Sequence, residues 1–134
     1  MTRRLKHWGW GFEDQWPGPD ALRDAAALAR TRLGYGADEP EQPVPLEQVT
    51  LPEPRLQPPE ALKGICRTDP YERALHAYGR SYIDIVRAFR GHFDHPPDVV
   101  ARPRDEHEVQ AVQAAAGPLG PGQLGVPISA HERR

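Results

Sequence analysis

Three side chains in the middle of the chain have the types that acid–base catalysis uses. Arg73, His76 and Asp84 supply a cation, an imidazole and a carboxylate within one short stretch. Gly79 lies between His76 and Asp84 and is expected to break the helix that carries them. We therefore expect Arg73 and His76 to pack or pair with other parts of a larger protein, and we assign no catalytic residue.

A second group could hold a metal ion. His92, Asp94 and His95 bring two imidazoles and a carboxylate close together in the sequence. A zinc site needs three or four ligands on a fixed backbone, and Pro96 and Pro97 follow directly. The segment is therefore predicted to be a polar loop, with no metal ligand assigned.

The single cysteine, Cys66, could act as a nucleophile. Such a thiol needs a lowered pKa and a base partner, and only Arg67 is adjacent. We expect an idle or buried thiol. One cysteine permits no internal disulfide, which fits a reducing compartment.

Residues 120–125 match the Gly-x-Gly-x-x-Gly pattern of dinucleotide-binding loops. The pattern indicates that function only between a strand and a helix, and Pro118, Pro121 and Pro127 prevent this context. We assign no cofactor-binding residue.

Composition limits the function classes further. The chain has 134 residues, enough for one small domain, with 38% hydrophobic residues, 16 prolines and 12 glycines. A net charge of −2 and a pI of about 6.3 give no reason to expect a nucleic-acid partner. Because no apolar run suits a signal peptide or a membrane span, we expect a cytoplasmic protein.

The first half is predicted to hold one helix and a tether. Apolar spacing predicts a helix over residues 20–33, with Asp20 as N-cap and Gly34 as its C-terminal stop. Seven prolines make residues 37–60 an extended tether. A short helix is expected over residues 59–66.

The second half is predicted to be helical, with one strand. Two helices are expected over residues 70–90, capped by Asp69 and Ser81. Residues 97–103 read as a strand, and Asp105 caps a helix over 106–116, which together make a βα unit. Residues 117–134 lack apolar periodicity and are expected to be a disordered tail.

Aromatic residues crowd the N-terminus. Trp8, Trp10 and Trp16 each carry a large apolar area, and we expect little within this chain for them to cover. They could stack on a flavin or a lipid chain. We favour packing against the body of a larger enzyme outside this chain.

Three segments together carry a family resemblance. The hexapeptide His-Trp-Gly-Trp-Gly-Phe at residues 7–12 resembles the opening of alkylglycerone-phosphate synthases and their bacterial flavoprotein relatives. Residues 73–84 resemble the helix-Gly-helix segment that precedes the flavin domain in that family. Residues 97–109 resemble the first strand and helix of the PCMH-type FAD-binding domain of the vanillyl-alcohol-oxidase-like superfamily.

The resemblance covers residues 7 to about 112 and implies an α+β fold, mostly helical, ending in the first βα unit of a truncated FAD-binding domain. Its divisions are an aromatic segment and first helix (1–36), a proline-rich tether (37–60), a helical region (61–96), an incomplete FAD-binding domain (97–116) and a disordered tail (117–134). The family's phosphate-binding Gly-Gly-Gly-Thr-Ser-type loop is absent. A shifted reading frame or a wrongly assigned gene end near codon 112 would explain this.

The implied enzyme uses non-covalently bound FAD to exchange the acyl chain of acyl-dihydroxyacetone phosphate for a fatty alcohol, a step in ether lipid synthesis. The chain itself is expected to bind no FAD and to be inactive alone, its partner being the remainder of the flavoenzyme if that is encoded separately. Three alternatives stay open: a relative of FAD-dependent 2-hydroxy-acid oxidases or dehydrogenases, a non-enzymatic helical interaction module, and a disordered adaptor that uses its proline tract.

Overall fold

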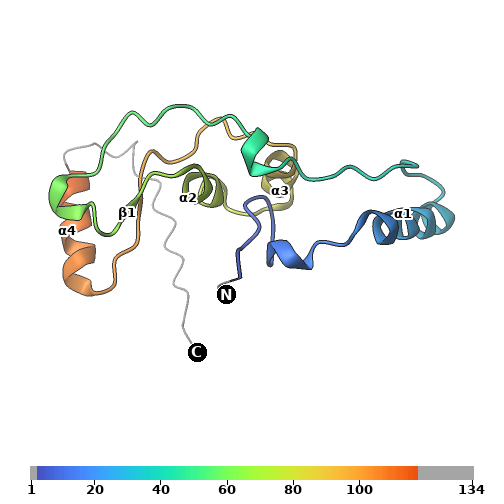
Figure 1. Cartoon of the computed structure of the whole chain (residues 1–134), viewed down its shortest axis with the longest axis horizontal. Helices are drawn as coiled ribbons and strands as arrows, with labels where there is room; N and C mark the ends of the chain where they lie inside the picture. The colour runs from blue at the N-terminus through green and yellow to red at the C-terminus, as the bar shows by residue number, and fades with distance from the viewer. Residues whose placement is uncertain (1–2, 118–134) are drawn as a thin grey trace.

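The computed structural model describes residues 3–117, which form an elongated, mostly helical molecule with one small sheet (Figure 1). Short 3-10 turns occupy Glu13–Gln15, Leu46–Gln48 and Glu60–Leu62. The longer elements are α1 (Pro19–Leu33), β1 (Cys66–Arg67), α2 (Pro70–Leu75), α3 (Tyr82–Phe89), β2 (Val100–Ala101) and α4 (Glu106–Ala116). The α+β class expected from the sequence is confirmed. Within residues 3–117, no helix combines the length and apolar character needed to cross a membrane.

Helix α1 begins before the residue that the sequence analysis chose. Gly18 is the N-cap and Pro19 the first helical residue, so the prediction of Asp20 as N-cap is wrong. The fixed φ of proline suits the first position of a helix, and this preference sets the start. Gly34 ends the helix as predicted, in the left-handed conformation with φ 76° and its N–H donating to the Arg30 carbonyl.

Helices α2 and α3 have the caps that the sequence predicts. The Asp69 carboxylate accepts from the Glu72 N–H at 3.1 Å. Ser81 and Asp84 form a reciprocal capping box at the start of α3. The chain changes direction between the helices at Arg80, whose φ of 65° is the only positive value for a non-glycine residue in the described part.

Strand β2 pairs with a segment for which a helix was expected. Cys66 lies opposite Ala101 and Arg67 opposite Val100 in an antiparallel ladder, and the Arg102 N–H donates to the Ile65 carbonyl at 2.8 Å. The helix predicted over residues 59–66 shrinks to the 3-10 turn Glu60–Leu62, so that prediction is wrong for its second half. Strand β2 and helix α4, capped by Asp105, follow in the predicted order, but β2 is confined to Val100–Ala101, so the strand bounds predicted over residues 97–103 are wrong.

The core is small and lies around α2 and α3. Its buried centre is Ala74, Ala88 and Phe93. Partly buried side chains that pack against it are Trp8, Leu46, Val49, Leu51, Ala77 and Tyr78. The proline-rich segment runs the length of the molecule, from α1 at one end to the neighbourhood of α4 at the other (Figure 1). It contributes Leu46, Val49 and Leu51 to the core, so it packs as well as connects.

Candidate functional site

Arg73 is a buried structural clamp. Its side chain comes from α2 and the residue is 4% exposed. Its Nε donates to the Pro97 carbonyl at 2.8 Å, and Nη2 donates to the Pro52 carbonyl at 2.7 Å. One guanidinium thereby joins α2 to the proline-rich segment and to the residues that precede β2.

The three residues considered for acid–base chemistry do not meet. His76 Nδ1 lies 2.9 Å from the Glu72 carbonyl oxygen and 3.7 Å from the Glu72 carboxylate. The Asp84 carboxylate accepts from the N–H and hydroxyl of Ser81 in the α3 cap. Because Arg73, His76 and Asp84 each have separate local partners, the structure gives them no joint catalytic geometry.

Glu72 forms a polar cluster that the sequence analysis did not find. This residue is 8% exposed and its carboxylate pairs with Arg102 at 2.7 Å, beside His76. The cluster connects α2 to the residue that follows β2. Burial of Glu72 is possible because Arg102 supplies the opposite charge.

The N-terminal hairpin (residues 5–12) places the aromatic residues. Leu5 and Phe12 form an isolated bridge, and the Lys6 N–H donates to the Gly11 carbonyl at 3.0 Å. Gly11 has φ 79°, and a Cβ there would lie 2.8 Å from Oε1 of Gln15. The turn therefore requires glycine at this position.

Two of the three tryptophans find partners within the chain, which corrects the expectation that there is little here for them to cover. The Trp8 ring meets Trp16 edge to face with centroids 4.8 Å apart, and Phe89 of α3 at 5.0 Å. Trp10 stays 69% exposed. Packing on α3 thus accounts for Trp8 and Trp16, and Trp10 is left at the surface.

Arg80 holds the hairpin onto the break between α2 and α3. Its Nη1 donates to the Gly9 carbonyl, with Lys6 O at 3.4 Å, and its Nη2 lies 3.5 Å from Leu75 O. Burial lowers the pKa of Arg80, as expected for a guanidinium removed from water. Sequence reasoning missed this role because the two bonded segments are more than 70 residues apart in the chain.

A groove of about 290 Å³ lies between the hairpin and the proline-rich segment. Its lining residues are Arg4, Lys6, His7, Trp8, Glu13, Trp16, Pro43, Val44, Pro45, Leu46 and Glu47. His7 is 7% exposed, and neither ring nitrogen has a hydrogen-bond partner in the described structure. Burial lowers the pKa of His7. The Val44 backbone lies close enough to raise this pKa in part, but its geometry does not make a hydrogen bond to either ring nitrogen.

The other sequence candidates lie apart from this groove. Cys66 sits in β1, and burial raises the pKa of its thiol. The His92 carbonyl accepts from the Tyr78 hydroxyl at 2.8 Å. Within residues 3–117, no cluster of three or more His, Cys, Asp or Glu side chains could hold a metal ion. The glycine pattern at residues 120–125 lies outside the described residues.

The fold is that of one part of a larger protein. Two solved structures of alkyldihydroxyacetonephosphate synthase, in different crystal forms, match 86% of this chain with TM-scores of 0.67 and 0.65. Sequence identity is 20% and 19%, so the likeness is one of fold. The chain spans 26% of the length of these structures. No family model and no curated protein sequence matches the chain.

The structural match agrees with the resemblance that residues 7–12, 73–84 and 97–109 suggested. The fold predicted from those segments is confirmed, and it corresponds to a part of alkyldihydroxyacetonephosphate synthase, an enzyme also called alkylglycerone-phosphate synthase.

Proposed function

We propose that this chain is the N-terminal, non-catalytic part of a flavoenzyme similar to alkyldihydroxyacetonephosphate synthase. The observation that carries the proposal is the structural match over 86% of the chain, together with its 26% share of the matched structures. The remaining body of such an enzyme would bind FAD and substrate. The chain's role is to form a packed unit against which that body is built.

The described residues do not suit FAD. The groove beside His7 has a volume of about 290 Å³. Pockets for drug-sized ligands usually measure roughly 300–1,000 Å³, and FAD is at the large end of that class. The groove also lacks a glycine-rich turn that directs successive N–H groups at a pyrophosphate. We therefore derive no flavin chemistry from this chain.

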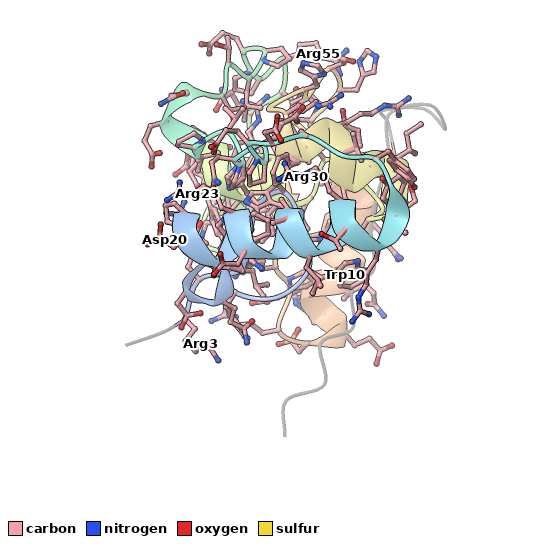
Figure 2. The ribbon with its side chains drawn as sticks, turned by 90° about the vertical axis from the view of Figure 1, so that its right-hand side faces the viewer. Arg3, Trp10, Asp20, Arg23, Arg30 and Arg55 are labelled. Carbon is pink, nitrogen blue, oxygen red and sulfur yellow. The ribbon has the colours of Figure 1, made fainter. Side chains whose placement is uncertain are left out.

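Exposed apolar side chains support a docking role. Trp10, Tyr82 and Ile83 are 69%, 85% and 56% exposed, and Arg80 Cζ lies 5.9 Å from the Trp10 ring centroid. Helix α1 has no buried residue. Figure 2 looks onto this helix, with Asp20 and Arg23 near its N-terminal end. An isolated helix of this length is marginal in water, so contact with further protein would stabilise it.

For the complete enzyme we propose the reaction of the matched synthase, exchange of an acyl chain for a fatty alcohol during ether lipid synthesis. FAD would supply the electron sink that holds the substrate. Oxidation of a 2-hydroxy acid is the alternative chemistry. We propose a cytoplasmic location and the remainder of the flavoenzyme as partner.

A second candidate function is a non-enzymatic interaction module. The exposure of α1 and Trp10 favours it, since both features suit docking on any partner. Cooperative thermal unfolding of the isolated chain, followed by circular dichroism, would support an independent module. A broad, non-cooperative change would support a part of a larger enzyme.

The first test is to mix the purified chain with FAD, desalt it and record flavin absorbance and fluorescence. We expect no retained flavin, and a yellow protein would contradict the proposal.

The second test is to sequence the coding DNA from codon 105 onward and translate every forward frame. We expect a strand followed by a Gly-Gly-Gly-Thr-Ser-like loop, and its absence from all frames would favour the interaction module.

A further inference from the structure

The imidazole of His7 is enclosed without a hydrogen-bond partner. The residue is 7% exposed, and within residues 3–117 its Nδ1 and Nε2 are the only buried side-chain nitrogen or oxygen atoms that make no hydrogen bond. The ring faces Phe93, with centroids 6.3 Å apart, and the neighbouring His92 and Asp94 are exposed. A protonated ring would place a charge and two unpaired donors in this site, so proton uptake costs more here than in water.

The charged groups around His7 leave most of this cost in place. Those that line the two cavities shared with His7 are Arg4, Lys6 and Glu13 from the hairpin and its flanks, Glu47 from the proline-rich segment, and Tyr78, Arg80 and Asp84 from around the break between α2 and α3. Glu13 pairs with Arg4 at 3.5 Å, so its charge is already offset. Burial has the largest effect and lowers the pKa of His7, although the Val44 backbone, Glu13 and Glu47 raise it in part.

The hairpin that carries His7 is held onto α2 and α3 by side chains. Within the described part of the chain, the backbone-to-backbone hydrogen bonds of residues 3–16 join these residues only to one another. The Tyr71 hydroxyl donates to the Leu5 carbonyl at 3.0 Å, and Arg80 donates to the Gly9 carbonyl. The Arg73 clamp and the ladder between β1 and β2 involve no hairpin residue. The hairpin can therefore leave its site while the rest of the fold keeps its hydrogen bonds.

We propose that His7 is a pH-sensitive latch, which keeps the hairpin docked on α3 while the imidazole is neutral and releases it when the ring takes up a proton from water. In the docked state Trp8 covers Phe89 of α3, with ring centroids 5.0 Å apart. Release hydrates the imidazolium and uncovers the apolar surfaces of both aromatic rings. The latch is independent of the proposed place of the chain in a flavoenzyme.

The ordinary pKa of histidine, about 6.5, sets the upper end of the range in which the latch responds. Below that pH the released state binds a proton more readily than the docked state, because burial lowers the pKa of docked His7. The ratio of released to docked hairpin should then rise by up to about tenfold for each pH unit, until the pH reaches the lower pKa of the docked state.

The test is a titration of the full chain from about pH 7.5 to about pH 5, a range above the ordinary pKa values of carboxyl groups. Tryptophan emission reports on Trp8 and Trp16, far-UV circular dichroism on the helices, and NMR of the imidazole ring on His7. We expect a reversible red shift of the emission at the pH where the His7 ring is protonated, while the helical signal persists. Emission that stays constant over this range, or a helical signal that is lost together with it, overturns the latch.

Two histidine variants provide the matched comparison. His7→Phe keeps an aromatic ring but cannot take up a proton, so its emission should stay at the docked value throughout the titration. His95→Phe is the control, because His95 is exposed, and it should respond as the parent chain does. An equal acid response in His7→Phe contradicts the proposal.

A further variant decides the matter if His7→Phe does not fold. Tyr71→Phe keeps the ring beside Arg4, with the Arg4 Cζ 4.1 Å from the ring centroid, and removes only the hydrogen bond to the Leu5 carbonyl. The docked state then loses one hydrogen bond, so the midpoint of release should rise by about 0.5–1 pH unit. A midpoint that is unchanged or lower in Tyr71→Phe, or that differs from the protonation midpoint of the His7 ring, refutes the latch.

Discussion

Arg73→Ala is the substitution that should cost this fold the most stability. The guanidinium is buried at 4% exposure and donates to the carbonyls of Pro97 and Pro52 at 2.8 and 2.7 Å. Each hydrogen bond from a charged donor contributes roughly 1.5–3 kcal/mol, and alanine removes both bonds to the part-buried Pro97 and Pro52 carbonyls. Because the two contributions are not additive, we expect a loss of about 3 kcal/mol in the free energy of unfolding.

Urea unfolding followed by tryptophan fluorescence measures this loss. If the chain unfolds in one cooperative step with a slope of roughly 1–3 kcal/mol/M, the midpoint should fall by about 1–3 M. If it unfolds gradually, the variant should retain less helix than the parent chain at each urea concentration, as circular dichroism measures. Arg73→Lys should recover only a small part, since an ammonium cannot reproduce the forked geometry that reaches two separate carbonyls.

Arg87→Ala is the matched control, because Arg87 lies on α3 with an exposed side chain. Its effect should stay within about 0.5 kcal/mol, as for most surface substitutions. Equal midpoints for the Arg73 and Arg87 variants would refute the clamp. If Arg73→Ala unfolds even without urea, circular dichroism records the loss directly, and the folded control makes the result specific.

Three further outcomes are expected. Because burial lowers the pKa of His7, the unfolded state binds more protons than the folded state below about pH 6.5. Stability should thus be fully present above that pH and fall as the pH decreases toward the lower folded pKa; His7→Phe should reduce this slope in urea titrations at several pH values. Gly11→Ala should cost about 1–2 kcal/mol, because φ is 79° and its Cβ would crowd Gln15, and an unchanged melting temperature would contradict this. Asp69→Ala should cost about 1 kcal/mol through loss of the bond from the Glu72 N–H, whereas Asp69→Asn should cost less in the same melting assay.

Local signals predicted much of the secondary structure. The caps at Asp69, Ser81 and Asp105 were predictable because each bond joins residues three positions apart. Asp20 failed as a cap since Pro19 satisfies the geometry of the first helical turn one residue earlier. Where two local signals compete, the residue type alone does not fix the boundary.

Contacts between distant segments were not predictable in the same way. Strand β1 has only two residues, and its pairing with β2 joins Cys66 to Ala101. Neither composition nor periodicity over so short a segment distinguishes a strand from a turn. The contact between Trp8 and Phe89 likewise depends on how the hairpin meets α3, and the His7 groove depends on how the hairpin meets the proline-rich segment.

The high proline content explains why arginine side chains donate hydrogen bonds to backbone carbonyls between distant segments of this fold. The chain contains 16 prolines, each of which keeps a carbonyl acceptor but lacks an N–H donor. A segment with so few N–H donors forms little regular ladder, so its carbonyls need other donors, and arginine carries five donors and no acceptor. Arg73 accordingly donates to the carbonyls of Pro52 and Pro97. Arg80 makes comparable bonds to carbonyls of the hairpin, which contains no proline. In this fold the guanidinium groups of Arg73 and Arg80 supply hydrogen bonds to backbone carbonyls that a larger sheet would otherwise satisfy. Because an ammonium cannot reach two separate carbonyls in the same way, replacement of these arginines by lysine should be poorly tolerated.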